Sequence, residues 1–362
     1  MRIALVGCGA VTQAVYVPLL SRRRDLFEVS AVCDLSRTLA DVVGDRLGAP
    51  RRYTSLAKML ADGGFEAVVV LASGSHGETV RRALAAGYAV LCEKPLALTR
   101  AEVAALPEGR LMVGYMKQYD PAVRRAVALL EELGGPAAVR SVEVTVLHPS
   151  GESQLAFANL ARAGDVDPGV LGSLRETEDA LVSRALGQAA PESLRNVYAV
   201  SLGSICHDLS LLRRFTGAPR EITYVDSWGP APGSVEISGP LPVAGRFHIR
   251  WHYLDGYPAY RETVAIHHDG GTLELVFPTP YLMNAPTTLT VVSGAETRAE
   301  HRQVTEAFEV QLTAFHAYVN DGSPPLTDAA GALEDIVTAQ RIAARYAVQH
   351  RLPIGGEAAA WT

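Results

Sequence analysis

The stretch LCEKP, residues 91–95, ends an apolar run with a glutamate, a lysine and a proline. The run predicts a buried strand, and the carboxyl ends of parallel strands face the crevice where α/β folds bind ligands. We therefore expect Lys94 at the edge of a reaction site. There it could hold a substrate hydroxyl or donate a proton to an alkoxide. The other interpretation is an exposed lysine at a strand end, without a chemical role.

A glycine-rich turn follows the first apolar run of the chain. The hexapeptide GCGAVT lies between an expected strand and an expected helix. In such a fingerprint the first glycine, Gly7, allows a tight turn, and the second, Gly9, lets the backbone approach a pyrophosphate. The phosphates would then rest on the helix start, which is formed by Ala10, Val11 and Thr12. Thr12 replaces the usual third glycine or alanine and is still small enough for close helix–strand packing.

An acidic residue ends the second expected strand. Asp34 lies where a carboxylate accepts hydrogen bonds from a ribose 2′-hydroxyl, and it would repel a 2′-phosphate, so it favours NAD over NADP as the cofactor. Arg37, three residues later, could contact a phosphate and keeps NADP as the less favoured alternative. The two residues could also be a solvated pair at a strand end, with no cofactor role.

The elements that would position these residues alternate through the first third of the chain. Continuous Val- and Leu-rich runs separated by helical patterns predict an α/β fold with a parallel, doubly wound sheet buried on both faces. The expected strands are Arg2–Gly7, Phe27–Asp34, Ala67–Ser73, Ala89–Cys92 and Leu111–Tyr115, and the expected helices include Ser36–Leu47, Gly77–Ala86 and Thr99–Ala105.

The pattern changes after a predicted helix at Pro121–Leu133. Strands then follow one another without intervening helices, which indicates a mostly antiparallel sheet. They are expected at Val139–Leu147, Glu221–Trp228, Ser234–Ser238, Arg246–Leu254, Arg261–His267, Thr272–Phe277 and Thr287–Ser293, and helices at Thr305–Asn320 and Thr327–Gln349 close the chain. Residues 150–195 are polar and interrupted by glycines, so we expect an insertion over one face that could act as a lid.

Composition excludes several classes of function. The chain has 362 residues, a net charge of −6 and an isoelectric point of about 5.9, which argue against a nucleic-acid partner. No segment is long and apolar enough for a membrane span. The four cysteines form no CxxC pair and suit a reducing cytoplasm. His248 and His252 lie four residues apart on a strand, too far to share one metal ion, so no metal site is predicted.

Nearly the whole chain resembles the Gfo/Idh/MocA family (glucose–fructose oxidoreductase / inositol dehydrogenase / MocA). The motifs that carry the resemblance are GCGAVT, Asp34, EKP at 93–95, GYMKQYDP at 114–121 and ICHDLSLLRRFTG at 205–217. The resemblance implies a Rossmann domain, residues 1–118, and a second α/β domain with an open antiparallel sheet, residues 119–362, whose last helix could pack on the first. It also implies NAD(P)-dependent hydride transfer at a carbinol or keto carbon of a sugar, aminosugar, nucleotide sugar or cyclitol.

The resemblance assigns roles to residues in two loops. It implies that Glu93 and Pro95 shape their turn and contact the cofactor, and that Lys94 is catalytic. In the loop SGSH at 73–76, His76 matches a family histidine near the nicotinamide ribose, whereas Ser73 stands among changed turn residues. His76 could instead cap the helix that follows.

A departure from the family concerns its second catalytic element, an aspartate followed four residues later by a histidine on one helix. His207 occupies the histidine position, but Gly203 stands where the aspartate is expected. His207 and Lys94 would then share the acid–base work, or another group would join them. A purely structural His207 is the alternative.

Three further side chains could contact substrate, namely Tyr115, Lys117 and Tyr198, although spacing alone places none of them. The leading hypothesis is an NAD-dependent dehydrogenase that forms a homodimer or homotetramer and takes a small-molecule substrate. Because the missing aspartate alters the proton-handling groups, a redox-neutral enzyme that retains its NAD, such as an epimerase, lyase or glycosidase, stays open. A non-catalytic dinucleotide-binding regulator is the third possibility.

Overall fold

The computed structural model describes residues Met1–Thr362, which form two compact units. The first unit contains Met1–Gly114, Leu155–Leu181 and Gln311–Ala332, and the second contains Tyr115–Gln154, Val182–Val310 and Leu333–Thr362. Part of the expected insertion, Leu155–Leu181, therefore belongs to the unit that carries the glycine-rich turn.

The first unit is built on a six-stranded parallel sheet in the order β3-β2-β1-β4-β5-β6. Its strands are β1 (Arg2–Val6), β2 (Glu28–Cys33), β3 (Arg51–Tyr53), β4 (Ala67–Val70), β5 (Ala89–Glu93) and β6 (Leu111–Gly114). Five of them match expected strands. The sequence missed β3, because this edge strand has only three residues and two of them are arginines.

Helices connect the parallel strands of the first unit. They are one π-helical turn (Thr12–Tyr16), α1 (Val17–Arg22), α2 (Arg37–Leu47), α3 (Leu56–Asp62), α4 (Gly77–Ala85) and α5 (Arg100–Ala104). Ser36 caps α2 by accepting a hydrogen bond from the Leu39 N–H, and Thr99 caps α5 in the same way from Glu102. The strands are buried on both faces, which explains their continuous apolar runs.

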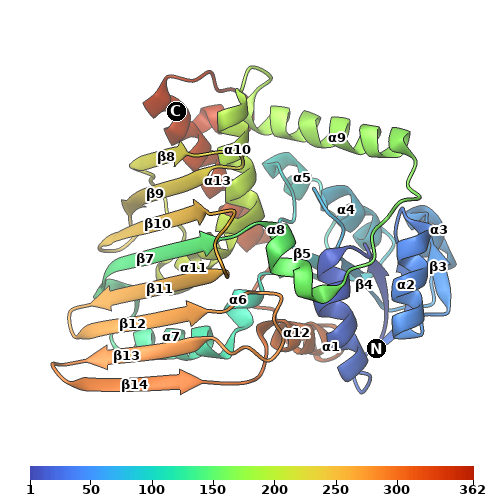
Figure 1. The fold of residues 1–362 in the computed structure, drawn as a ribbon, viewed down its shortest axis with the longest axis horizontal. Coiled ribbons are helices and arrows are strands. Elements are labelled where there is room, and N and C mark those ends of the chain that lie inside the picture. The colour runs from blue at the N-terminus through green and yellow to red at the C-terminus, as the bar shows by residue number, and fades with distance from the viewer. The chain divides into compact units, whose positions relative to one another are not determined.

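The second unit is built on an eight-stranded sheet in the order β14-β13-β12-β11-β7-β10-β9-β8, which Figure 1 shows side by side. Only β7 and β10 pair in parallel, and every other neighbouring pair is antiparallel. The strands are β7 (Val139–His148), β8 (Tyr224–Trp228), β9 (Ser234–Pro240), β10 (Arg246–Tyr253), β11 (Arg261–His268), β12 (Gly271–Phe277), β13 (Thr288–Ser293) and β14 (Thr297–Arg302). The predicted fold class is confirmed. The sequence missed β14, since nearly all its side chains are exposed and no apolar alternation marks it.

Helices complete the second unit and the segments that link the two units. They are α6 (Met116–Tyr119), α7 (Pro121–Glu132), α8 (Gly151–Leu155), α9 (Pro168–Leu186), α10 (Glu192–Val200), α11 (Cys206–Thr216), α12 (Ala307–Asp321) and α13 (Ala329–His350), with a π-helical turn at Ser201–Ile205. The long helix α9 lies in the expected insertion, and most of its residues are exposed, including the apolar Val170, Leu171 and Leu174.

Two chain-wide features accompany this architecture. All four cysteines are free and buried. Burial raises the pKa of the Cys33 thiol to about 11, so it stays protonated. None of the helices combines the length and the apolar composition that crossing a membrane requires.

Candidate functional site

The glycine-rich turn follows β1 in the first unit and packs closely against the turn after β4. Gly7 has φ +97°, and a Cβ there would lie 2.5 Å from the backbone nitrogen of Ala72, so no larger residue fits. The Thr12 hydroxyl donates a hydrogen bond to the Gly7 carbonyl at 2.7 Å. At Gly9, by contrast, a Cβ would meet nothing within 4 Å. This open backbone leaves room for a ligand's phosphates to approach, as the fingerprint requires.

Asp34 lies just beyond the carboxyl end of β2, and its carboxylate joins two loops. One oxygen accepts a hydrogen bond from the Cys8 N–H at 2.7 Å, and the other accepts one from the Ser36 N–H at 2.8 Å. The carboxylate is therefore fixed between the glycine-rich turn and the start of α2. Each oxygen keeps a further lone pair that can accept a hydrogen bond from a ribose hydroxyl.

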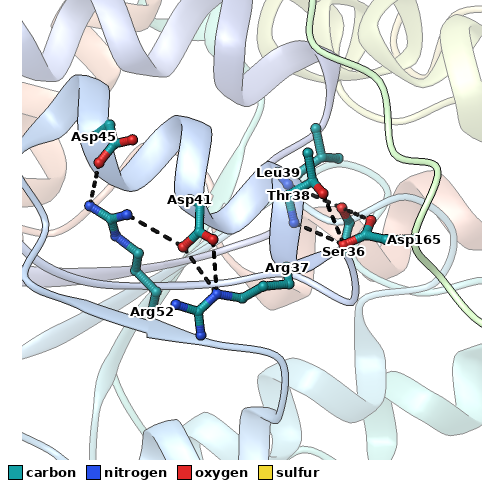
Figure 2. A network of polar contacts seen from close by, with 8 residues as sticks. All are labelled: Ser36, Arg37, Thr38, Leu39, Asp41, Asp45, Arg52 and Asp165. Carbon is teal, nitrogen blue, oxygen red and sulfur yellow. Dashed lines mark hydrogen bonds and ion pairs between the residues drawn. The ribbon is translucent and has the colours of Figure 1, made fainter.

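Arg37 does not turn toward Asp34. Its Nε lies 3.0 Å from both carboxylate oxygens of Asp41, one turn along α2. Asp41 also accepts from Arg52 at 3.4 Å, and Arg52 bonds Asp45 at 2.6 Å (Figure 2). The guanidinium groups that could attract a phosphate are thus already paired on the exposed side of α2, and the predicted cofactor contact of Arg37 stays a prediction.

A carboxylate from a distant segment lies at the start of α2. Asp165 accepts hydrogen bonds from the Ser36 hydroxyl at 2.5 Å, from the Thr38 N–H at 2.9 Å and from the Thr38 hydroxyl at 3.1 Å (Figure 2). The bond from Ser36 and the Thr38 N–H hold the pKa of this carboxyl at about 2. Sequence reasoning missed this contact, because no local pattern links residue 165 to α2.

The same segment also bonds the helix that follows the glycine-rich turn. The side-chain amide of Gln13 donates to the Ala161 carbonyl at 3.1 Å and accepts from the Ala161 N–H at 2.9 Å. Gln13 donates to the Cys8 carbonyl as well, at 2.9 Å. Residues 161–165 therefore run along the edge of the Rossmann sheet where the glycine-rich turn and Asp34 lie.

Lys94 lies at the carboxyl end of β5, half-buried, next to a buried carboxyl. Glu93 is buried and accepts a hydrogen bond from the Tyr16 hydroxyl at 2.6 Å, and Gln311 donates to that hydroxyl at 3.2 Å. Burial raises the pKa of Glu93, while the bond from Tyr16 and the charge of Lys94 oppose the rise. Glu93 thus anchors the end of β5 from inside the unit.

His76 is buried and connects the two turns on either side of this strand end. Its Nδ1 lies 2.6 Å from the Pro95 carbonyl oxygen, and its Nε2 lies 2.5 Å from the Ala72 carbonyl oxygen. Because both ring nitrogens face backbone acceptors, His76 holds the turn that carries Lys94 and Pro95. Ser73, in the same loop as His76, is exposed.

In the second unit, His207 lies at the start of α11, directly after the π-helical turn. Such turns inside helices occur frequently at functional sites. Gly203, in that turn, is exposed, and a Cβ there would meet nothing within 4 Å. The Trp251 indole donates to the Ser204 hydroxyl at 2.8 Å, which ties the turn to β10.

Asp208, the residue after His207, belongs to a buried ionic cluster. Lys117 forms ion pairs with Glu262 and, at 3.6 Å, with Asp208, and the Tyr260 hydroxyl donates to Glu262. Burial raises the pKa of Asp208, with Lys117 opposing and Glu262 adding to the rise. Burial disfavours the charged Lys117, but Glu262 and Asp208 outweigh it and raise its pKa. Sequence reasoning missed Glu262, although it shares the buried face of β11 with Val264 and Ile266.

The three side chains predicted to contact substrate are all buried in the second unit. Tyr115 is 2% exposed and packs against the guanidinium of Arg213, 5.6 Å from its ring centre. Lys117 is held by the ionic cluster, and Tyr198 is 1% exposed in α10. These positions give Tyr115 and Lys117 internal partners, and their contact with substrate stays a prediction.

The part of the chain that contains the glycine-rich turn and Asp34 is similar to known proteins. An oxidoreductase family described as having an NAD-binding Rossmann fold matches residues 1–108. Over 149 residues the chain is 32% identical to D-xylose 1-dehydrogenase (NADP(+)) 2 of Haloferax volcanii, covering 39% of this chain and 45% of that protein. The chain thus spans less than half the length of that curated relative.

Two longer similarities extend over nearly the whole chain. Inositol 2-dehydrogenase of Acidothermus cellulolyticus is 27% identical over 341 residues, which cover 89% of this chain and 85% of that protein. The crystal structure of the WlbA dehydrogenase from Bordetella pertussis, in complex with NADH and UDP-GlcNAcA, shares 19% identity and a TM-score of 0.67, covering 95% of this chain and 96% of that one. At this identity the structural likeness establishes the fold.

Proposed function

We propose that this chain is an NAD-dependent oxidoreductase, because residues 1–108 match the Gfo/Idh/MocA oxidoreductase family with its NAD-binding Rossmann fold. It would act on a CH–OH group, or the matching ketone, of a sugar, aminosugar, nucleotide sugar or cyclitol. The names of the relatives, a xylose dehydrogenase and an inositol dehydrogenase, support this substrate class. One of those names carries NADP(+), so the family match alone leaves the choice of dinucleotide open.

The observation that carries the proposal is the position of Lys94. Its strand β5 pairs with β4, which pairs with β1, all in parallel, so their carboxyl ends share one edge of the sheet. The glycine-rich turn and Asp34 lie at that same edge, where open α/β sheets bind ligands. The chain therefore combines a dinucleotide-binding turn and a half-buried amine within one unit.

The residues present fit a dinucleotide. Gly7 permits the close turn, the backbone at Gly9 is open to phosphate, and Asp34 offers lone pairs to a ribose. When bound, NAD supplies the hydride acceptor for oxidation and NADH the donor for reduction. Lys94 would take up the hydroxyl proton as the C–O bond becomes a carbonyl, and would return it in the reverse direction. His207 is proposed as a second group for this proton, on the basis of the sequence motif.

The test uses the full chain and two readouts. NADH binding is first measured by nicotinamide fluorescence, and turnover is then followed with inositol, xylose, aminosugar and nucleotide-sugar substrates by nicotinamide absorbance and by substrate loss. We expect net reduction of NAD with at least one substrate class. We also expect Lys94→Met to lower kcat by about 10²–10⁴-fold while NADH binding is kept. Lys58→Met, which removes an exposed lysine of α3, is the matched control and should leave both values unchanged.

Two outcomes would contradict the proposal. Substrate loss without any net change in nicotinamide absorbance would indicate a redox-neutral enzyme that returns the hydride internally. Firm NADH binding with unchanged levels of every substrate tested would favour a dinucleotide-binding regulator. Normal turnover by Lys94→Met would reject the assigned role of Lys94 while leaving the oxidoreductase class in place.

A further inference from the structure

The start of α2 directs three hydrogen-bond donors at one point. They are the Ser36 hydroxyl, the Thr38 N–H and the Thr38 hydroxyl, and all three bond the carboxylate of Asp165 (Figure 2). Hydroxyl groups beside a free N–H at a helix N-terminus are a favourable set of partners for a phosphate. In this chain the set is filled by an anion from the protein itself.

These donors lie next to the residue that would contact the ribose. Asp34 accepts a hydrogen bond from the Ser36 N–H at 2.8 Å, so the ribose-binding carboxylate and the three donors share one short loop. In dinucleotide-binding folds the residue at this strand end faces the ribose 2′ position, and a 2′-phosphate must find its partners close by. Ser36 and Thr38 lie two and four residues after Asp34, and their donors are neutral groups that such a phosphate could use.

We propose that Asp165 is a specificity-determining residue, which occupies the place of the 2′-phosphate at the start of α2 and thereby makes the enzyme select NAD and exclude NADP. The inference rests on the proposed function, because it concerns the dinucleotide of that same site. Asp165 lies in the segment Leu155–Leu181 of the first unit, outside the sequence motifs of the Rossmann sheet.

Charge makes the exclusion effective. Asp165 carries a full negative charge at neutral pH, since the Ser36 bond and the Thr38 N–H lower its pKa to about 2. A 2′-phosphate would meet this charge and find the three donors already engaged, and like charges brought together strongly disfavour binding. The nearby arginines offer no compensation, because Arg37 bonds Asp41 and Arg52 bonds both Asp41 and Asp45.

The backbone around Asp165 is held in place independently of its carboxylate. Four residues earlier, Ala161 exchanges two hydrogen bonds with the side chain of Gln13. Asp165 itself is exposed, so replacing it removes charge and hydrogen bonds without opening a cavity in the core. Substitution of Asp165 should therefore change the site's charge while the fold is kept.

The experiment compares the dissociation constants of NADH and NADPH, by nicotinamide fluorescence, for the full chain and three variants. Wild type should prefer NADH. Asp165→Ala should tighten NADPH binding by about tenfold or more, and Asp165→Asn by less, since asparagine keeps an oxygen acceptor without the charge. NADH binding should change less than about threefold in both variants, because the 2′-hydroxyl of NADH carries no charge. Asp167→Asn, two residues along the same segment, is the matched control and should leave the ratio unchanged.

A second substitution tests the donor set directly. If a phosphate takes the vacated place in Asp165→Ala, then adding Thr38→Val, which removes one donor hydroxyl, should reverse a large part of the gain in NADPH affinity. An unchanged NADPH-to-NADH ratio in Asp165→Ala, or equal changes for both dinucleotides, would overturn the inference while leaving the proposed function intact. Equal wild-type affinity for the two would also overturn it. Failure of wild type to bind either dinucleotide would reject the proposed function, and this inference with it.

Discussion

His76 holds Pro95 through its ring, with Nδ1 2.6 Å from the proline carbonyl oxygen, directly after Lys94 in the chain. The opposite ring nitrogen lies 2.5 Å from the carbonyl oxygen of Ala72, which packs against the glycine-rich turn. One buried imidazole therefore contacts both the turn that carries the proposed catalytic amine and the turn after β4, which packs against Gly7. We therefore expect His76 to act as a positioning residue for Lys94.

Replacing His76 by alanine should remove these contacts. A half-buried carbonyl would lose the ring N–H that donates to it, so we expect the free energy of unfolding to fall by about 1–3 kcal/mol, measured by urea denaturation. We also expect kcat to fall more than KM changes, because Lys94 would be less well oriented. His248→Ala, which removes a half-buried histidine of β10, should affect kcat little. Unchanged kcat and stability in His76→Ala would contradict the positioning role.

The bond between Tyr16 and Glu93 should make stability depend on pH in a predictable direction. Tyr16→Phe leaves a buried carboxyl without its donor, which should lower the free energy of unfolding by about 1–3 kcal/mol at neutral pH. The pKa of Glu93 is raised in the folded protein. Ionising its carboxyl therefore lowers the free energy of unfolding, and it does so only as the pH rises above the ordinary pKa of 4.5.

The loss caused by Tyr16→Phe should therefore be largest near neutral pH and should shrink below pH 4.5, where the carboxyl becomes neutral in both the folded and the unfolded state. Urea denaturation at several pH values measures it. Tyr224→Phe, at an exposed tyrosine of β8, is the control. A loss that grows as the pH falls would mean that the hydroxyl does not support the Glu93 carboxylate.

Asp208 offers a second pH test, in the ionic cluster of the second unit. Its pKa is raised above the usual 3.8 by burial, so the folded state binds its proton more tightly than the unfolded state does. Wild-type stability should then fall as the pH rises above 3.8, by up to about 1.4 kcal/mol per pH unit while the carboxyl titrates.

Asp208→Asn is neutral at every pH and can still donate a hydrogen bond to Glu262, so its stability relative to wild type should increase with pH in this window. Parallel urea denaturation of the two proteins gives the difference. Asp269→Asn, at an exposed carboxylate paired with Arg140, should show a flat difference over the same window. If the stability difference between Asp208→Asn and wild type did not change with pH, the pKa of Asp208 would not be raised in the folded protein, and the prediction would be wrong.

Gly203 allows a gain-of-function test of the family pattern. A Cβ at this position meets nothing within 4 Å, so Gly203→Asp should fold with a change in stability below about 1 kcal/mol. If the family carboxylate assists His207, this variant should raise kcat and shift the pH dependence of kcat. Gly203→Asn has the same shape without the charge and should do neither. Equal effects of both variants would exclude a role for the charge.

The sequence predicted most of the fold because the decisive signals were local. Apolar runs marked β1, β2, β4, β5 and β6, and the alternation of polar and apolar residues marked most of the second sheet. Short motifs predicted an oxidoreductase family with an NAD-binding fold, and such a family matches residues 1–108. Where local signals were weak, as in the polar edge strand β14, the prediction failed, because pairing with β13 rather than side-chain pattern defines that strand.

The sequence by itself determined which chemical groups stand at strand ends, including Lys94, Asp34 and the glycines of the first turn. Only the tertiary structure decided which partners those groups have. Asp165 reaches Ser36 across 129 residues of chain, and Glu262 reaches Lys117 across 145. Contacts of this kind depend on how separate segments pack, and a hydrogen bond or ion pair between them leaves no mark on the periodicity of either segment.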